Sequence, residues 1–519
     1  MQTTSRVAAV VALAVLAGLA PAASADPVPS SSPTTQIASD AAWCWFSEPR
    51  AVQSGGVTFL GWITSAGDVT IGSFESQSGN ARRFVLMTDF QVDDHDHPAV
   101  LLRPDGRLQA FWSAHNGGEL HTRTSVRPRD ISAWGPLGTV PVKAPGDRVS
   151  TYANPIVLPA ERNRLYVFAR SGYEHVTFTS SDDMGRSWSP AHVLVAEPGQ
   201  RPYVKYADDG RGTIAMAFTN GHPAETHSSI YYAAYRAGAV RRTGGQPVAA
   251  TAQLPIAPRQ ADLVFASPAD RDAWVHDVAF DASGRPRIVF ATMPQRGTGP
   301  HDYWYAAWTG SAWLARRITD AGHSISDDPR EPAYTAGISL DHDDPAVVVL
   351  ARPGTAKLEI ERWRTGDLGK SWTHEAITSA SVDDNVRPVI PRGSTGSVIW
   401  MAGHYGYFTS FRTAAATNSM VMPHAPLPSS VNARVTVRDA TVSITASLAS
   451  LFVLAVPGKE LTLQARPVHW KTWQRVGLAT SNNGGVASFR VRKRPGWEYR
   501  VVWPGDHSMM RAESQPVAG

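Results

Sequence analysis

The run from Asp93 to His97 reads Asp-Asp-His-Asp-His, and a further histidine, His115, follows about one hairpin later. Imidazole titrates near neutral pH, so these side chains could transfer protons in a reaction. The same residue types could also bind zinc or another divalent ion, although their spacing matches no compact metal motif. We favour a polar loop in which aspartate orients a catalytic histidine. A calcium or zinc site is the alternative.

The histidines belong to a repeat in which a proline opens an apolar strand and a turn residue follows eight positions later. Pro98 with Gly106 and Pro155 with Asn163 are two copies of this pattern. A second strand follows each turn, and the intervals between copies suit four-stranded blades with loops. Pro202 and Pro388 open two more copies, and in a fifth copy His276 replaces the proline. Pro49 and Pro332 open two looser copies, which makes seven openings along the chain.

The positions of these openings predict which residues surround the central channel of a β-propeller. The innermost strand of each blade lines the channel, so the residue just before each opening should lie at its mouth. Most residues at these positions are polar or charged, which favours a polar binding funnel. The far ends of the second strands should emerge on the same face. The first set is Glu48, His97, Asn154, Arg201, Val275, Glu331 and Arg387, and the second includes His115, Arg170, Tyr173, His222 and His404.

Two segments, residues 181–188 and 365–372, share the pattern Ser/Thr-x-Asp-x-Gly-x-x-Trp, in which a tight turn precedes a tryptophan that packs between sheets. Hydrophobic residues make up 43% of the chain and charged residues only 18%, which is typical of a folded protein. Long helical periodicity is absent. We therefore predict an all-β chain in which residues 41–426 form a seven-bladed β-propeller.

Near residue 427 the pattern changes to short alternating strands, with a strong turn signal at Asn482-Asn-Gly-Gly485. Residues 427–519 are predicted to form a small immunoglobulin-like β-sandwich that acts as an accessory domain. Trp470, Trp473 and Trp497 could offer a sugar platform there, although core packing is the interpretation we favour.

The N-terminus has the features of an export signal. A positive Arg6 precedes an apolar run, and the small residues before position 26 suit a cleavage site. Residues 1–25 are therefore predicted to be a signal peptide. Residues 26–40, rich in Pro, Ser and Thr, are predicted to be a flexible leader. We expect a secreted, extracellular protein.

Charge and cysteine content restrict the partners. The net charge is only +4 and no long basic run occurs, which argues against a nucleic-acid partner. After the N-terminal run, the sequence has no second apolar stretch of spanning length, so a membrane partner is not expected. The single cysteine, Cys44, lies between two tryptophans and is predicted to be a buried thiol. No nucleotide motif or redox cofactor is expected, and a monomer is the default for a propeller.

Five segments carry a family resemblance. They are residues 43–50 (Trp-Cys-Trp-Phe-Ser-Glu-Pro-Arg), 93–98, 199–205, 220–223 and 385–388. Residues 181–188 and 365–372 resemble the Asp-box of neuraminidase repeats. Together with these two Asp-boxes, the five segments resemble the neuraminidase-repeat (BNR, Asp-box) propeller family, which includes seven-bladed ulvan lyases and L-rhamnose-α-1,4-D-glucuronate lyases. The resemblance implies a polysaccharide lyase that cuts next to a uronic acid, with an acidic polysaccharide or oligosaccharide as its substrate.

The resemblance also implies residue roles. The catalytic histidine pair would be His97 and His115, with His95 as an alternative to His97, and Tyr152 and Arg170 would complete the centre. β-Elimination needs a base for the C5 proton, an acid for the leaving oxygen, and a cation on the uronate carboxylate. Substrate contacts would come from Arg50, Glu48, Asn154, Arg201, Tyr203, His222, His276, Glu331, Arg387 and His404.

Two other functions compete with a lyase. Sialidase-like or rhamnosidase-like glycoside hydrolases also use Asp-boxes, and Arg50, Arg201 and Arg387 could imitate the arginine cluster of a sialidase. Against this, the first blade of sialidases places Arg before Ile-Pro, whereas this chain has Glu48-Pro49-Arg50. A non-catalytic glycan-binding propeller is the third candidate.

Overall fold

The structure is a computed structural model, and nearly all of it consists of strands, turns and loops, which confirms the all-β prediction. Among the residues that the structure describes, no helix is both long and apolar enough to cross a bilayer. The predicted signal peptide and residues 26–33 of the predicted leader lie outside the described residues. The described residues are 34–295, 299–394, 396–418, 429–450, 456–505 and 511–519.

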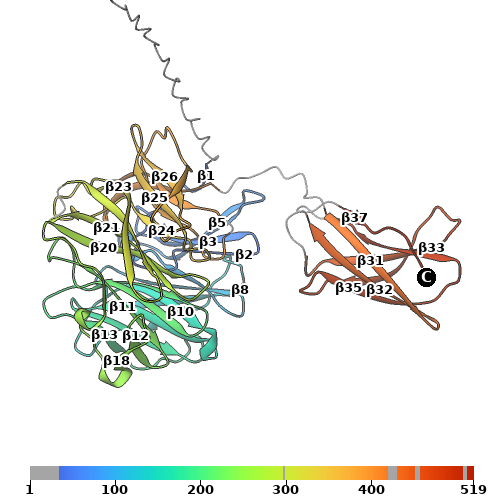
Figure 1. Cartoon of the computed structure of the whole chain (residues 1–519), viewed down its shortest axis with the longest axis horizontal. Helices are drawn as coiled ribbons and strands as arrows, with labels where there is room; N and C mark the ends of the chain where they lie inside the picture. Colours follow the sequence, from blue (N-terminus) through green and yellow to red (C-terminus); the bar gives the residue numbers. More distant parts are fainter. Residues whose placement is uncertain (1–33, 296–298, 395, 419–428, 451–455, 506–510) are drawn as a thin grey trace, which may run out of the picture.

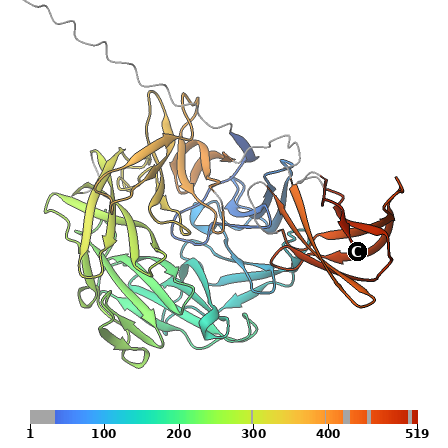
Figure 2. The same ribbon diagram turned by 45° about the vertical axis from the view of Figure 1, so that its right-hand side comes forward.

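Residues 35–417 form seven antiparallel sheets, most of them built from strands that follow one another along the chain. Six of the seven predicted openings fall in or just before the first strand of a sheet, and Pro332 lies six residues before β24 (Ile338–Leu340). The sheets succeed one another around a ring in a propeller-like arrangement (Figures 1 and 2). The first three sheets contain β2 (Ala51–Ser54), β3 (Val57–Ile63), β4 (Val69–Glu75) and β5 (Ala81–Met87); β6 (Ala99–Leu102), β7 (Arg107–Ser113), β8 (Leu120–Pro128) and β9 (Gly138–Val140); and β10 (Ser150–Leu158), β11 (Arg164–Ser171), β12 (His175–Ser181) and β13 (His192–Ala196).

The next three sheets repeat the pattern, and the fourth of the seven carries extra strands at its outer side, where β19 pairs with β16. Short 3-10 turns connect some strands: η2 (Pro159–Glu161), η3 (Thr251–Gln253) and η4 (Pro258–Gln260). The strands are β14 (Tyr203–Asp208), β15 (Thr213–Thr219), β16 (Ile230–Arg236), β17 (Ala239–Arg241), β18 (Pro247–Ala250) and β19 (Asp262–Phe265); β20 (Arg271–Phe280), β21 (Pro286–Pro294), β22 (His301–Trp308) and β23 (Trp313–Gly322); and β24 (Ile338–Leu340), β25 (Val347–Pro353), β26 (Leu358–Arg364) and β27 (Thr373–Ala376).

The seventh sheet joins the two ends of the ring. It contains β28 (Asn385–Val389), β29 (Ile399–Tyr407) and β30 (Ser410–Thr417), and its outer strand is β1 (Thr35–Ala38). β1 pairs antiparallel with β30, with Thr35 opposite Thr417. The predicted flexible leader therefore contains a strand near its end. Its Pro, Ser and Thr content suggested a linker, but backbone pairing with β30 supplies the hydrogen bonds that order these four residues.

Residues 41–50 are buried and bond to several sheets at once. Trp45 Nε1 donates to the Val275 carbonyl at 3.2 Å, and Asn154 Nδ2 donates to the Phe46 carbonyl at 3.0 Å. These partners lie on β20 and β10, which belong to different sheets. The segment therefore occupies the place where the first strands of several sheets converge, and it supplies large aromatic side chains to the main core.

The Asp-boxes form compact turns at the ends of strands. Asp183 Oδ1 accepts the backbone N–H of Ser187 at 2.9 Å, and Gly185 has a φ of 91°, a left-handed conformation that glycine adopts without a Cβ clash. Trp188 packs against a buried cluster. The second box, residues 365–372, repeats the turn and its hydrogen bonds. Both boxes have structural contacts of the kind that the motif predicts.

The C-terminal residues form two sheets that share one buried cluster. Side chains at alternate positions enter this cluster, as expected for sheets with one solvent-facing side. One sheet contains β31 (Ser429–Arg438), β32 (Thr441–Ser450) and β35 (Val486–Arg492). The other contains β33 (Glu460–Pro467), β34 (Gln474–Thr480), β36 (Trp497–Trp503), β37 (Ala512–Glu513) and β38 (Val517–Ala518).

The closing strand gives a stability prediction. Ile37 of β1 packs, partly buried, against the main core, whereas Gln36 is exposed. Replacing Ile37 by Ser should cost about 1 kcal/mol of burial and lower the Tm by about 2–4 °C in differential scanning calorimetry. The matched Gln36→Ser variant should keep the wild-type Tm. Equal Tm values for both variants would contradict the packing of Ile37 against the main core.

Candidate active site

The acidic run between β5 and β6 forms a short 3-10 turn, η1 (Asp94–Asp96). Asp93 caps this turn, because its Oδ1 accepts the backbone N–H of His95 at 2.9 Å. Two distant segments fix the same turn: Asp94 N donates to the Phe408 carbonyl at 2.8 Å, and Cys44 N donates to the Asp94 carbonyl at 3.0 Å. The backbone at His95 is therefore set by its own cap and by the β29–β30 turn.

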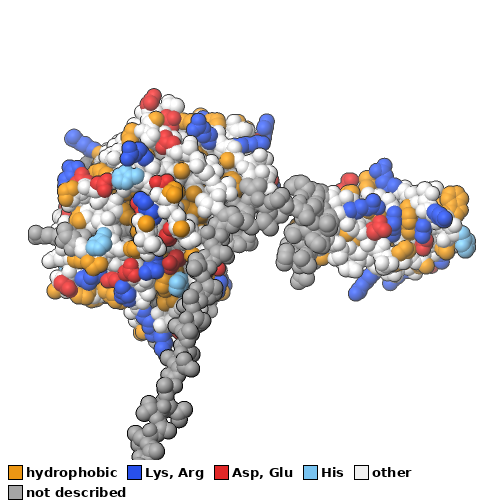
Figure 3. Space-filling view, turned by 90° about the horizontal axis from the view of Figure 1, so that it is seen from above, with side chains coloured by type: hydrophobic (Ala, Val, Ile, Leu, Met, Phe, Trp, Pro, Cys, Tyr) orange, Lys and Arg blue, Asp and Glu red, His pale blue; other side chains and the backbone are white. Residues whose placement is uncertain are grey.

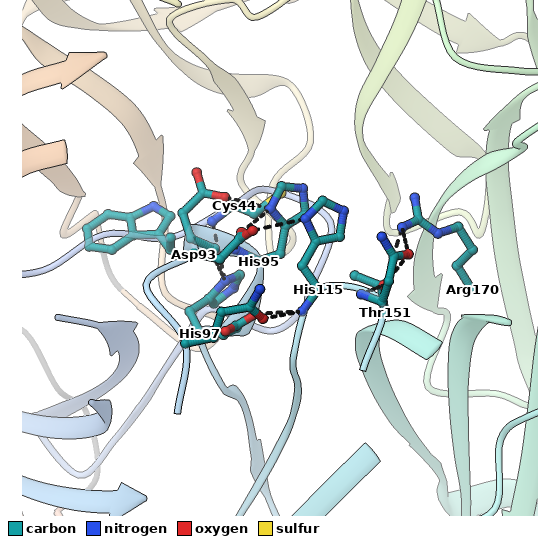
Figure 4. Close-up of polar contacts among 12 residues, drawn as sticks. Cys44, Asp93, His95, His97, His115, Thr151 and Arg170 are labelled. Atoms are coloured by element: carbon teal, nitrogen blue, oxygen red, sulfur yellow. Dashed lines mark hydrogen bonds and ion pairs between the residues drawn. The ribbon is translucent and has the colours of Figure 1, made fainter. Parts of the chain in front are cut away.

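The carboxylate of Asp93 binds two imidazoles at once (Figure 4). Its Oδ1 lies 2.5 Å from His95 Nδ1, and its Oδ2 lies 2.9 Å from His115 Nδ1. The two rings stack with their centroids 4.0 Å apart, and Phe408 contacts both rings edge-on. Because Asp93 engages both Nδ1 atoms, Nε2 is the ring nitrogen left to exchange protons with a bound molecule.

The two histidines have opposite pKa shifts. Burial alone would lower the pKa of His95, but the charge of Asp93 and their hydrogen bond outweigh burial and raise this pKa well above 6.5. Burial and the neighbouring positive charge of His95 lower the pKa of His115 to about 4. At neutral pH the pair therefore consists of one charged and one neutral imidazole. Such a division suits one proton donor and one proton acceptor.

Arg170, at the end of β11, faces this pair from the next sheet. Its Nη1 donates to Tyr203 Oη at 3.0 Å, and its Nη2 donates to Asn116 Oδ1 at 3.1 Å and to Thr151 Oγ1 at 3.2 Å. All three acceptors are neutral, so within the described residues the positive charge of Arg170 is not paired with a carboxylate. The guanidinium is thus positioned firmly and remains able to pair with an anion.

Tyr152 lies between the arginine and the histidines. Its ring centroid is 5.0 Å from the Arg170 guanidinium carbon and 5.4 Å from the His95 ring centroid. Burial and the nearby Tyr203 raise its pKa well above 10, so the phenol keeps its proton. Its φ is 66°, at an irregularity in the pairing of β10 with β11. A left-handed tyrosine costs about 1–3 kcal/mol, and such strain is concentrated at functional sites.

The hairpin that carries His115 is fastened to the strand that carries Tyr152. Ser150 and Gly117 exchange two backbone hydrogen bonds, of 2.7 and 3.1 Å. Asn116 N donates to Thr151 Oγ1 at 2.8 Å. The distance between the imidazole pair and the Tyr152–Arg170 pair is therefore set by backbone contacts rather than by mobile side chains.

His97 lies apart from this group. It is fully buried, and its ring nitrogens contact only backbone: Nδ1 lies 3.0 Å from the Asp94 carbonyl and Nε2 lies 3.3 Å from the Ser47 carbonyl. Burial lowers its pKa to about 4. Of the predicted catalytic residues, the structure brings together His115, Tyr152 and Arg170. The imidazole beside His115 is that of His95, which the sequence analysis gave as the alternative to His97.

Arg387, predicted to contact substrate, is 1% exposed and lies beneath the imidazole pair. It forms an ion pair with Asp94 Oδ2 and donates to Tyr405 Oη at 2.7 Å. Asp94 Oδ1 in turn lies 3.0 Å from His95 Nδ1. Burial would raise the pKa of Asp94, but the charge of Arg387 outweighs it and lowers this pKa. The arginine thus supports the charged His95 from below.

Other predicted substrate contacts are also buried and paired with protein groups. Glu48 Oε1 lies 2.9 Å from both Arg50 Nη2 and Lys205 Nζ, which is a buried three-charge cluster. His276 Nε2 lies 2.9 Å from Thr335 Oγ1, and its ring stacks on Trp45. The buried members of the predicted set are Glu48, Arg50, Asn154, Tyr203, His222, His276 and Arg387.

Three predicted residues keep more contact with solvent. Arg201 forms an ion pair with Glu225, and its guanidinium lies 5.1 Å from the Tyr173 ring centroid. Glu331 lies 3.3 Å from His222. His404 is 52% exposed and lines a cavity of about 290 Å³ together with Tyr405. Among the predicted substrate contacts, these three side chains are the least buried.

The donor set of the site could hold a metal ion of one kind. One donor atom from each of Asp93, His95 and His115 lies within 4.8 Å of the others. One carboxylate and two imidazoles suit zinc, whereas calcium takes six to eight oxygen ligands. A zinc ion held there would take the place of the Nδ1 protons between Asp93 and the two imidazoles, and it would supply Lewis-acid chemistry. The hydrogen bonds between Asp93 and the two Nδ1 atoms hold the same three side chains together in the structure described.

The sheets and this site define a propeller-like β protein with a histidine–tyrosine–arginine centre. The chain belongs to the BNR repeat-containing family, whose model matches residues 57–321. It is similar to the ulvan lyase PL25 of Pseudoalteromonas sp. (strain PLSV), at 21% identity over 355 residues, which cover 57% of this chain and 70% of that protein.

Two solved structures of PL25 ulvan lyase resemble the fold. One, bound to -[GlcA(1-4)Rha3S]-, has a TM-score of 0.58 at 15% identity and covers 74% of this chain and 94% of its own. The other has a TM-score of 0.59 at 14% identity and covers 74% and 95%. At these identities the likeness establishes the propeller-like fold.

Sequence reasoning missed several residues of the site. Phe408 contacts both imidazoles, but an aromatic residue after β29 gives no local signal of this role. Asn116 holds Arg170 and has a φ of 56°. Its position directly after His115, before two glycines, is a turn signal that could have drawn attention to it.

The buried state of His97 predicts a pH effect on stability. Its folded-state pKa of about 4 lies below the usual 6.5, so the unfolded chain binds more protons between these values. Stability should therefore fall as pH drops from 6.5 to 4, with about 3 kcal/mol of the loss due to His97. The His97→Asn variant should show a shallower fall in the urea unfolding free energy. The exposed His404→Asn variant should follow the wild-type curve, and equal slopes for all three proteins would refute the assignment.

Proposed function

We propose that the protein is a polysaccharide lyase that cuts next to a uronic acid by β-elimination. The observation that carries this proposal is a site that combines a neutral imidazole, a charged imidazole, a protonated tyrosine and an arginine whose hydrogen-bond partners in the described part of the chain are all neutral. We also propose that the seven sheets are the seven blades of a propeller, with β1 closing the last blade.

Arg170 is proposed to bind the carboxylate of the uronate. The C5 proton of a uronate is weakly acidic while the carboxylate keeps its full charge, because the developing enolate would carry a second charge. A positioned guanidinium offsets this charge as it develops. Its neutral partners, Tyr203, Asn116 and Thr151, fix the geometry without neutralising it.

His115 is proposed as the base. Its Nδ1 donates to Asp93, so Nε2 carries the lone pair that accepts the C5 proton. The imidazolium that forms would be stabilised by the Asp93 carboxylate, which holds the ring in one orientation. His95, charged at neutral pH, keeps Asp93 ionised and adds a second positive group beside the substrate carboxylate.

Tyr152 is proposed as the acid. Its phenol holds a proton at neutral pH and lies beside Arg170, where the oxygen leaving C4 would take that proton. The C5–H and C4–O bonds break, a C4–C5 double bond forms, and the proton from Tyr152 completes the new chain end. Electrons and atoms balance without a redox cofactor.

The comparisons support this class and suggest its substrate. The relatives named above are ulvan lyases, and one was solved with a glucuronate–rhamnose sulfate chain bound. We therefore propose a rhamnose- and glucuronate-containing glycan as substrate. A glycoside hydrolase would instead need two carboxyl groups flanking the scissile bond. In this site the carboxylate of Asp93 is buried and occupied by two imidazoles.

We further propose an export signal, an accessory domain and a monomeric state. Residues 1–25 would direct export and be removed, leaving a secreted, extracellular protein whose mature mass shows the cleavage site. Residues 427–519 would form an immunoglobulin-like sandwich, and the protein would act as a monomer without a required metal ion.

The assay separates the three candidate functions. A lyase releases unsaturated uronate that absorbs in the ultraviolet, a hydrolase releases reducing ends without that absorbance, and a lectin binds without either product. Arg170→Met, His115→Asn and Tyr152→Phe should each lower kcat by about 10²–10⁴-fold. His97→Asn is the matched control and should stay within about tenfold of wild type. A hydrolase product, or full activity in Arg170→Met, would refute the lyase mechanism.

The pKa values also predict the pH profile of the lyase. His115 must be neutral to accept a proton, so kcat/KM should rise through an apparent pKa of about 4 as pH increases. Tyr152 must keep its proton, and its raised pKa extends the plateau into alkaline pH. The rates should be recorded over pH values at which circular dichroism shows a folded protein. An acidic limb near 6.5 would contradict the assignment of His115 as base.

A further inference from the structure

Positive charge is concentrated in the C-terminal residues. Residues 429–519 contain twelve Lys and Arg against five Asp and Glu, a net charge of +7, although the whole chain carries only +4. The rest of the chain is therefore negative overall. In the space-filling view, Lys and Arg side chains outnumber acidic ones on the visible face of the C-terminal body (Figure 3). This body would attract a polyanion more strongly than the remainder of the protein.

The sheet of β31, β32 and β35 has an outer face made of hydroxyl groups. The side chains of Val442, Ile444 and Ala446 point into the core. The alternate positions on β32 must then point outward, because successive side chains of a strand face opposite sides. These outward residues are Thr441, Ser443, Thr445 and Ser447.

Four arginines flank this row of hydroxyls on both sides. Arg434 and Arg438 lie on β31, and Arg490 and Arg492 lie on β35. The strand register places Arg434 opposite Thr445, Arg438 and Arg492 opposite Thr441, and Arg490 opposite Ser443. All four are exposed. With strands about 4.8 Å apart, the two rows of arginines stand about 10 Å apart across the sheet.

These arginines differ from those on the other sheet of the domain. Arg466 Nε lies 2.6 Å from Glu498, and Arg500 Nη1 lies 2.9 Å from Glu513. Both also flank the Trp473 ring, at 4.3 and 4.4 Å from its centroid. By contrast, the four arginines of the hydroxyl face make no ion pair with an acidic residue in the described part of the chain.

We propose that this arginine–hydroxyl face binds an acidic polysaccharide, as a second site separate from the propeller centre. Guanidinium groups pair bidentately with carboxylate or sulfate groups, and a flat row of Ser and Thr can bond to sugar hydroxyls. A membrane-binding face would instead present large apolar side chains for insertion. Two sites on one chain would raise the local concentration of substrate at the propeller by avidity.

The test is affinity electrophoresis of the full mature chain in native gels that contain alginate, a polyuronate, with dextran as the neutral control. All proteins carry Arg170→Met, so the propeller site contributes less to binding. We expect retardation by alginate and none by dextran. Arg434→Ser with Arg490→Ser should weaken alginate binding about fivefold. The matched control, Lys471→Ser with Arg475→Ser, removes equal charge elsewhere on the domain and should bind as the parent does.

A further variant guards against misfolding of the double mutant. Thr445→Asp places one negative charge in the middle of the exposed face and should also weaken alginate binding, with an unchanged circular dichroism spectrum. If the Lys471→Ser, Arg475→Ser control weakens alginate binding equally, the binding depends only on the total charge of the domain, which would overturn the proposal. No retardation of the parent by alginate, or binding to phosphatidylserine vesicles instead, would also overturn it.

The outcome is independent of the proposed lyase reaction. The gel measures binding, whereas the lyase is measured by unsaturated product. Binding that depends on this face, without any unsaturated product from wild-type protein, would leave the second site standing and refute the lyase. Unsaturated product without face-dependent binding would do the reverse.

Discussion

The carboxylate of Asp93 is the interaction on which the candidate site depends. It caps η1, accepts from His95 with one oxygen and from His115 with the other, and so joins a loop to the following hairpin. Removing water from three ionisable groups is costly unless each is paired. Because one carboxylate serves two stacked rings, only one ring can readily hold a second proton. The division into a charged and a neutral imidazole follows from this sharing.

The rest of the ring keeps that arrangement in place. Arg387 from the seventh sheet holds Asp94 ionised directly below His95, and β1 adds a strand to the same sheet. Residues 41–50 fill the space between the sheets with aromatic side chains, and their backbone carbonyls bind buried cations such as Lys205. The charged residues near the channel therefore support the site from beneath instead of lining an open funnel.

The eight-residue spacing from an opening residue to a turn residue, seen in five copies, marks the first hairpin of five of the seven sheets. The sequence also identified three of the four side chains proposed for chemistry. The sequence could not distinguish His95 from His97. In a strand, two residues at this spacing would point to the same side, but the turn η1 directs these two side chains differently. The sequence also placed Arg387 and Glu48 toward substrate. Their burial depends on residues 41–50, a segment whose position follows only from the closed ring.

The most direct test of the shared carboxylate is a pH titration of the histidine ring nitrogens by nitrogen-15 NMR, with signals assigned through His95→Asn and His115→Asn. We predict that His115 remains neutral, with its proton on Nδ1, down to pH values near 4, while His95 remains charged through neutral pH. Two histidines that both lose their protons near pH 6.5 would contradict it, because Asp93 would then not divide the pair.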